Sequence, residues 1–107
     1  MASYISLYRY TQQGIQNIKQ SPARLDEAKE LIKAAGGELK GFYFTMGQYD
    51  LVTIAEFPDD ASAAKLQLAV ASQGSVRAET LKAFTEDEYR RIIGELTDVY
   101  EPTYARR

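Results

Sequence analysis

The sequence contains no cysteine and no histidine. Without cysteine, the chain cannot form disulfides, thiolate nucleophiles or sulfur-ligated metal sites. Without histidine, it lacks both the commonest general base and the commonest metal ligand in proteins. Zinc catalysis of the usual kinds and haem held by His or Cys are therefore excluded, and we expect neither a metal nor another cofactor.

Long apolar runs and blocks of like charge are absent as well. No stretch approaches the roughly 18 apolar residues of a membrane span, and the first residues lack the charged and apolar regions of a signal peptide. The 13 basic and 15 acidic residues give a net charge of -2 without a basic block, which argues against nucleic-acid binding. We therefore expect a cytoplasmic protein that binds neither membranes nor nucleic acid.

The remaining composition is that of one folded domain. The chain has 107 residues, of which 45% are apolar and 26% charged, and this size is sufficient for a single core. Apolar periodicity predicts an α+β, ferredoxin-like fold of order β-α-β-β-α-β, with helices on one face of a four-stranded antiparallel sheet and an added C-terminal helix. The domain is expected at 1–97 and a tail at 98–107. The predicted strands cover 4–10, 38–44, 51–57 and 76–84, and helices follow Ser21, Pro58 and Thr85, with a short helical turn near Ile15 and Ile18.

Local signals mark where the helices begin. Ser21-Pro22 is typical of an N-cap residue followed by proline at the first helical position. Thr85 and Glu88 have the spacing of a capping box. Residues at three- and four-residue spacing are predicted to face the core. They are Leu25, Ala28, Leu31, Ile32 and Ala35 in the first helix, Ala64, Leu68 and Ala71 in the second, and Tyr89, Ile92, Ile93 and Leu96 in the last.

Alternation along the strands predicts which side chains face the helices. We assign Ile5 and Leu7 to the helix-facing side of the first strand, and Val52 and Ile54 to that side of the third. The opposite face would then be too apolar to remain in water, so a second subunit packed sheet to sheet is expected, giving a homodimer or a higher homo-oligomer of the α/β-barrel type. The residues assigned to this open face are Tyr4, Ser6, Tyr8, Tyr10, Leu51, Thr53 and Ala55.

The turn Thr45–Asp50, between the second and third strands, contains Gly47-Gln48-Tyr49-Asp50. Gly47 is expected to supply a positive φ angle. The Asp50 carboxylate either accepts backbone N–H groups of the turn or acts as a general base or ligand anchor. Tyr49 either packs at the subunit interface or donates its hydroxyl to a ligand. Tyr49 and Asp50 are thus the candidate catalytic residues, and the structural interpretation of each is preferred.

A candidate ligand site combines aromatic, hydroxyl and charged side chains. Arg77 and Glu79 share one side of the fourth strand, and the sequence leaves open which side that is. Inside a dimer barrel, Arg77 would bind the anionic group of a small acid or carbonyl compound while tyrosines donate hydrogen bonds. At a solvated edge, the pair would add less than about 1 kcal/mol. The other predicted members of the site are Tyr8, Tyr10, Tyr43, Thr45 and Thr53.

Two acidic clusters, at 59–60 and 86–88, invite a metal interpretation. Both lie at predicted helix starts, where the helix dipole alone favours acidic residues. Neither has the spacing of an EF-hand loop. We therefore predict no metal site at either cluster.

Several separated motifs resemble the GYD domain family. They are Tyr10-Thr11-Gln12-Gln13-Gly14, Ser21-Pro22, Gly47-Gln48-Tyr49-Asp50, Glu56-Phe57-Pro58-Asp59-Asp60 and the segment Val76–Thr85. The likeness runs from residue 3 to about residue 96. It implies a ferredoxin-like domain of the dimeric α/β-barrel type, in a family without an assigned biochemical function. The wider superfamily includes cofactor-free monooxygenases, muconolactone isomerases, haem-dependent enzymes and amino-acid-sensing domains, so the fold alone implies no activity.

Three functions remain open at this point. The first is a non-catalytic small-molecule-binding or assembly domain that acts as a homo-oligomer. The second is a cofactor-independent isomerase or monooxygenase-like enzyme acting on a small carbonyl or acid compound. The third is a protein-interaction module that uses the tail at 98–107. The poor catalytic inventory favours the first.

Overall fold

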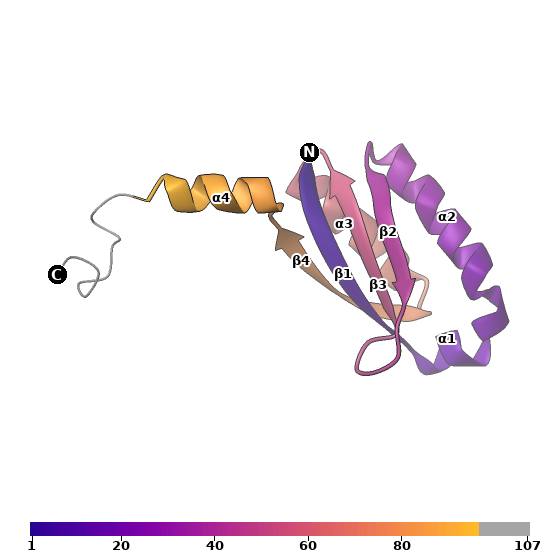
Figure 1. The fold of residues 1–107 in the computed structure, drawn as a ribbon. Coiled ribbons are helices and arrows are strands. Elements are labelled where there is room, and N and C mark those ends of the chain that lie inside the picture. The colour runs from indigo at the N-terminus through magenta and orange to yellow at the C-terminus, as the bar shows by residue number, and fades with distance from the viewer. Residues whose placement is uncertain (97–107) are drawn as a thin grey trace.

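The computed structural model describes residues 1–96, so the predicted tail at 98–107 lies outside the described residues. The secondary structure follows the predicted order, with a final helix that leaves the body of the domain (Figure 1). The elements are β1 (Ala2–Tyr10), α1 (Gln12–Gln16), the 3-10 helix η1 (Ile18–Gln20), α2 (Ser21–Ala34), β2 (Glu38–Phe44), β3 (Leu51–Phe57), α3 (Asp60–Ser72), β4 (Val76–Ala83) and α4 (Glu86–Gly94).

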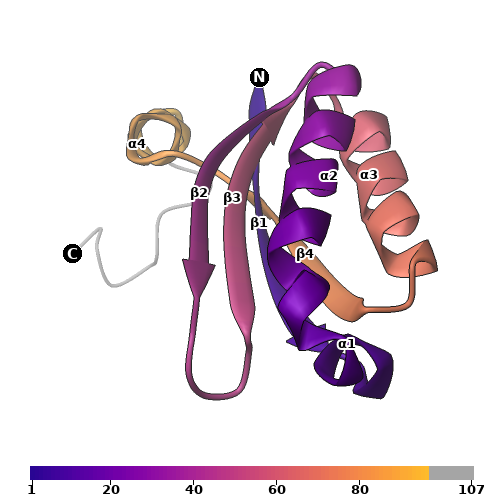
Figure 2. The same cartoon turned by 90° about the vertical axis from the view of Figure 1, so that its right-hand side faces the viewer.

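The four strands form one antiparallel sheet in the order β2-β3-β1-β4. The helices α2 and α3 lie against one face of this sheet, and α4 lies on the side of the other face (Figure 2). The predicted ferredoxin-like fold is therefore confirmed. The face away from α2 and α3 is called the open face below.

The edge strand β2 contains a bulge. Leu39 pairs with Ala55 whereas Gly41 pairs with Ile54, so Lys40 is an extra residue on β2. Its ammonium group lies 3.2 Å from a carboxylate oxygen of Glu38 and 4.0 Å from one of Glu56. The bulge thus places a basic side chain among acidic ones at the end of the sheet away from the hairpin.

The core lies between the sheet and the two helices α2 and α3. Tyr4 and Phe57 meet edge to face, with ring centroids 5.8 Å apart, and the Tyr4 hydroxyl donates a hydrogen bond to Asp60 at the start of α3. This bond raises the pKa of Tyr4 to about 12. The buried apolar residues are Tyr4, Ile32, Ala55, Phe57 and Ala63.

The prediction of which strand side chains face the helices is wrong. Tyr4 pairs with Ala55, and both lie in the core with Phe57, so this side of the sheet faces the helices. The large rings of Tyr4 and Phe57 fill the space under α2 and α3, and Asp60 supplies the acceptor that a buried tyrosine hydroxyl needs. The predicted faces are therefore exchanged: Tyr4, Ser6, Tyr8, Tyr10, Leu51, Thr53 and Ala55 face the helices, whereas Ile5, Leu7, Val52 and Ile54 form the open face.

Two details of the helices also differ from the prediction. Gln20 precedes α2, and Ser21 has helical φ and ψ angles because η1 runs directly into the helix. The Ser21 hydroxyl instead lies 3.0 Å from that of Tyr10. In α3, Leu68 is 70% exposed while Ala63 is buried, so the predicted stripe of Ala64, Leu68 and Ala71 is on the outer side. Asp59, which accepts the Ser62 N–H, fixes where that helix begins.

Candidate binding surface

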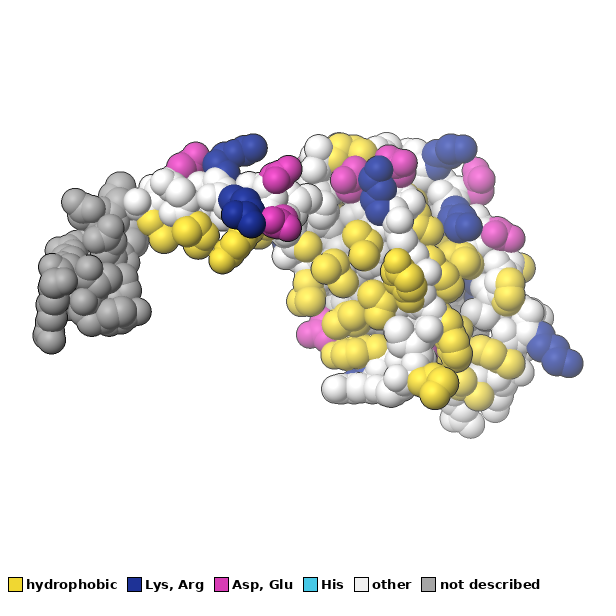
Figure 3. Space-filling model, viewed as in Figure 1, with side chains coloured by type: hydrophobic (Ala, Val, Ile, Leu, Met, Phe, Trp, Pro, Cys, Tyr) yellow, Lys and Arg dark blue, Asp and Glu magenta, His cyan; other side chains and the backbone are white. Residues whose placement is uncertain are grey.

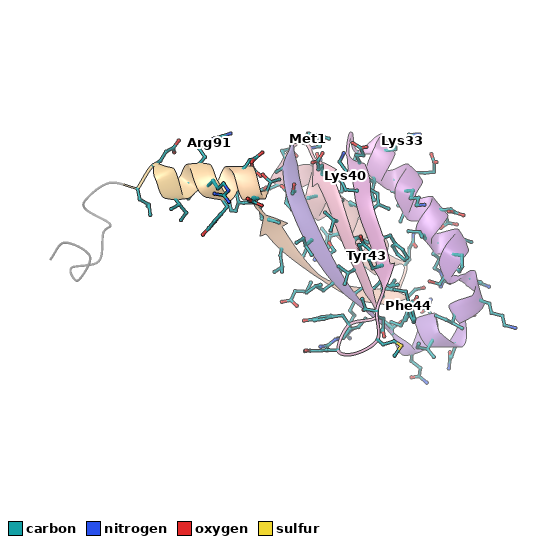
Figure 4. All side chains as sticks on the ribbon, in the orientation of Figure 1. Met1, Lys33, Lys40, Tyr43, Phe44 and Arg91 are labelled. Carbon is teal, nitrogen blue, oxygen red and sulfur yellow. The ribbon has the colours of Figure 1, made fainter. Side chains whose placement is uncertain are left out.

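The open face carries a continuous apolar surface. Along β1, Ile5 has Ile54 as its neighbour on β3 and Leu81 as its neighbour on β4. Leu81 is 46% exposed, and Tyr43 on the edge strand is 60% exposed. Figure 3 shows hydrophobic side chains spread over this face, and Figure 4 shows Tyr43 near the hairpin end of β2 and Lys40 nearer the opposite end. The apolar residues of the open face are Ile5, Leu7, Tyr43, Val52, Ile54, Leu81 and Ala83.

A second apolar surface lies along α4. The predicted capping box is present: Thr85 Oγ1 accepts the Glu88 N–H at 3.2 Å, and Glu88 Oε1 accepts the Thr85 N–H at 2.9 Å. The second bond lowers the pKa of Glu88. Because α4 extends past the edge of the sheet, its apolar residues do not face the core as predicted. This α4 stripe consists of Tyr89, Ile92, Ile93 and Leu96, which are between 45% and 59% exposed. Figure 3 shows hydrophobic side chains along α4.

The turn between β2 and β3 is held by several hydrogen bonds. Gly47 has φ +135°, as predicted. The Thr45 N–H donates to the Asp50 carbonyl at 2.7 Å, and the Asp50 N–H donates to the Tyr8 carbonyl at 2.8 Å. The Asp50 carboxylate accepts the Tyr10 N–H at 2.9 Å. Asp50 therefore binds backbone N–H as the structural interpretation expected, but on the neighbouring strand β1 and not within its own turn.

Tyr49 lies within a group of charged side chains at the hairpin end of the open face. Its hydroxyl donates to Glu79 Oε2 at 2.8 Å, which raises the pKa of Tyr49. The guanidinium carbon of Arg9 lies 4.9 Å from the centroid of its ring, and Arg9 Nε donates to the Gln48 carbonyl at 3.0 Å. Arg77 pairs directly with Arg9 across β1 and β4. We call Arg9, Tyr49, Arg77 and Glu79 the polar cluster; sequence analysis identified three of its members and missed Arg9.

The predicted ligand residues do not form one site, because the sheet separates them. Tyr43, Arg77 and Glu79 lie on the open face. Thr45 lies in the hairpin, where its hydroxyl donates to the Tyr49 carbonyl at 2.6 Å. Tyr8, Tyr10 and Thr53 instead line a cavity of about 100 Å³ between the sheet and the helices.

Comparison with known proteins identifies the family. The family model described as the GYD domain matches residues 4–93, which include Gly47-Gln48-Tyr49-Asp50. The chain belongs to the GYD domain family.

Two matches from Thermus thermophilus, one a protein sequence and one a solved structure, are similar to this GYD domain. One is called glutamine synthetase and cystathionine beta-lyase binding protein; it is 34% identical over 84 residues, which make up 78% of this chain and 88% of the relative. The other, the crystal structure of TTHA0845, has a TM-score of 0.52 at 24% identity and covers 79% of this chain and 95% of that chain. The second likeness shows the fold.

Both acidic residues of the 59–60 cluster make structural contacts in this GYD domain. Asp59 accepts the Ser62 N–H at 2.8 Å, which lowers its pKa. The Tyr4 hydroxyl and then the Lys82 ammonium group lower the pKa of Asp60. Within residues 1–96, no three acidic side chains gather closely enough to hold a metal ion. Over the same residues, no helix is long and apolar enough to cross a membrane.

Proposed function

We propose that this GYD domain is a non-catalytic binding protein that acts as a homo-oligomer, whose subunits meet through the open face, and that the assembly binds an enzyme. The observation that carries this proposal is the apolar surface formed by the open face and the α4 stripe. Monomeric proteins rarely leave a contiguous apolar patch of several hundred Å² in water, and such patches usually mark an interaction site.

The size of this surface favours a second copy of the chain as its occupant. Strands about 4.8 Å apart and about 3.3 Å per residue give the sheet face an area of roughly 19 by 23 Å. Two such faces bury only about 900 Å², whereas a stable interface needs at least about 1,000 Å². The nine residues of α4 add about 140 Å² per copy at 1.5 Å per residue and a width of about 10 Å. The two surfaces together therefore exceed the required area.

The contacts of the candidate catalytic residues favour binding over catalysis. A carboxylate that acts as a general base must be able to reach the proton that it removes from a bound substrate. The Asp50 carboxylate is instead bonded to the backbone of β1, and the Tyr49 hydroxyl donates to Glu79. Both residues therefore support the hairpin and the polar cluster.

The Thermus relative supplies the first candidates for the partner. Its name gives glutamine synthetase and cystathionine beta-lyase as the proteins that it binds, and its sequence matches over most of both chains. We propose that this GYD domain binds one of these two enzymes.

One pair of variants tests both parts of the proposal. Leu81→Glu would place two carboxylates in the dry interface, where unpaired charge is strongly unfavourable. Leu68→Glu is the matched control, because Leu68 is 70% exposed on the outer side of α3. Light scattering after size exclusion should show an oligomer for the wild type and Leu68→Glu and a folded monomer for Leu81→Glu. Each protein is then passed over immobilised glutamine synthetase and cystathionine beta-lyase.

The outcomes separate assembly from enzyme binding. A wild-type monomer at tens of micromolar would refute assembly through the open face. An oligomer that binds neither enzyme would refute the enzyme partner and leave the assembly in place. Binding by the wild type and Leu68→Glu, lost in Leu81→Glu, supports the whole proposal.

A further inference from the structure

Two arginines of the polar cluster occupy directly opposed positions. Arg9 on β1 pairs with Arg77 on β4, and both lie exposed on the open face. Side chains that face each other on antiparallel strands have Cβ atoms only about 5 Å apart, and like charges in that arrangement repel. Such a pair is unfavourable, and an anion between the two guanidinium groups would relieve the repulsion.

The structure holds Arg9 in place without neutralising it. Its Nε donates to the Gln48 carbonyl at 3.0 Å, and its guanidinium stacks on the Tyr49 ring. These contacts fix the plane of the guanidinium and use only some of its five N–H donors. Among residues 1–96, neither Arg9 nor Arg77 forms an ion pair.

The neighbouring carboxylate is directed to another partner. Glu79 Oε2 accepts the Tyr49 hydroxyl at 2.8 Å, and this bond raises the pKa of Tyr49. The cluster therefore holds two cationic side chains and one anionic side chain, in a chain whose net charge is -2. The other carboxylate at this end, that of Asp50, accepts the Tyr10 N–H, so both carboxylates near the two arginines are bonded to other partners.

We propose that Arg9 and Arg77 bind a small soluble oxyanion, the carboxylate or phosphate group of a metabolite, which bridges the two guanidinium groups. A guanidinium presents parallel N–H donors that match two oxygens of such a group. The apolar residues Ile5 and Leu7 lie next along β1 on the same face, and a covering subunit would exclude water from the bound ion. The site lies within one chain, so the inference does not depend on the assembly or on the enzyme partner.

The test uses inorganic phosphate and acetate as probes, at constant ionic strength in sodium chloride. Each probe is titrated into ¹⁵N-labelled protein while the backbone and arginine Nε resonances are followed. Saturable shifts centred on Arg9 and Arg77 are expected with at least one probe. Arg9→Gln and Arg77→Gln should each weaken binding at least about tenfold, because each removes one charge-assisted contact.

Two further variants provide controls. Arg90→Gln removes an arginine of α4 whose Nε is paired with Glu86 at 2.8 Å, and it should leave binding unchanged. Arg77→Lys keeps the charge but loses the planar donor pair, so its affinity should lie between those of the wild type and Arg77→Gln. Circular dichroism of each variant verifies that it is folded.

Three results would overturn this inference. One is a set of chemical shifts that grow linearly with the concentration of both probes and do not saturate. Another is an Arg90→Gln variant whose affinity for the probe falls as much as that of Arg77→Gln. The third is an oligomer that binds neither probe and dissociates on Arg77→Gln, because the arginines would then hold a carboxylate of the second copy. The Leu81→Glu variant should still bind the probe as a monomer, so failure of the assembly and failure of the anion site are distinguishable.

Discussion

Replacing Asp50 by alanine tests whether the aspartate at the end of the turn is structural. The change removes the acceptor of the Tyr10 N–H, a bond of 2.9 Å between the hairpin and β1. A hydrogen bond to a charged group contributes about 1.5–3 kcal/mol. Water can reach the freed N–H because Asp50 and Tyr10 are only partly buried. We therefore expect the free energy of unfolding to fall by about 2 kcal/mol.

Urea denaturation followed by far-ultraviolet circular dichroism measures this change. A loss of about 2 kcal/mol lowers the midpoint by about 1–2 M urea for a domain of this size. Asp50→Asn keeps a neutral acceptor, so its loss should be about half as large. Asp26→Ala, on the exposed side of α2, is the matched control and should stay within about 0.5 kcal/mol of the wild type. All proteins are compared at one concentration.

A midpoint for Asp50→Ala equal to that of Asp26→Ala would refute the structural role. If that variant also lost binding of the enzyme partner while its stability stayed unchanged, Asp50 would belong to a functional site. If the loss of stability is largest for Asp50→Ala, smaller for Asp50→Asn and smallest for Asp26→Ala, the carboxylate of Asp50 holds β1 against the hairpin.

Two more predictions concern single residues of the body and of α4. The hydrogen bond to Asp60 raises the pKa of Tyr4 from 10.0 to about 12, so between these pH values the folded state keeps a proton that the unfolded state releases. The free energy of unfolding should therefore fall between pH 10 and pH 12. Urea titrations at several pH values should show that Tyr4→Phe removes this part of the fall. Gly14→Ala should cost about 2–3 kcal/mol, because its Cβ would overlap the Ser75 carbonyl oxygen. Gly94→Ala, which meets open space in a helix, should be neutral or raise stability by about 0.5 kcal/mol; equal melting temperatures for the two alanine variants would contradict the close packing at Gly14.

The order of the elements was predictable because its signals are local. The capping box of Thr85 and Glu88 and the positive φ of Gly47 follow from the chemistry of a few neighbouring residues. Strand alternation likewise located all four strands to within about two residues. These features need no knowledge of what lies across the sheet.

The orientation of the sheet was not predictable from apolar alternation, because both faces are apolar. A strand that is buried on both sides gives no contrast between its faces. Charged residues of the same parity carry the signal that the prediction missed. Glu56 shares its side with Val52 and Ile54, and Arg9 shares its side with Ile5. A charged side chain is easily placed at the rim of an open face but not under a helix, so this side is the open one.

The polar cluster depends on contacts between distant parts of the chain. Residues 9 and 77 meet only because β1 and β4 pair in one particular register, and a shift of one residue would send one of them to the other face. Tyr49 joins them because the hairpin folds back onto β1. No local sequence pattern predicts that these residues come together in the polar cluster.

The bulge at Lys40 has a consequence for how copies of the chain can add to one another. An edge strand exposes unpaired N–H and C=O groups on which another sheet can continue without limit, as in fibrils. The extra residue interrupts that row on β2 and adds a lysine beside it, which makes continuous growth at this edge unfavourable. Association through sheet faces, in contrast, is self-limiting. Two copies related by a two-fold axis bury each other's face, so no equivalent surface is left for a third copy.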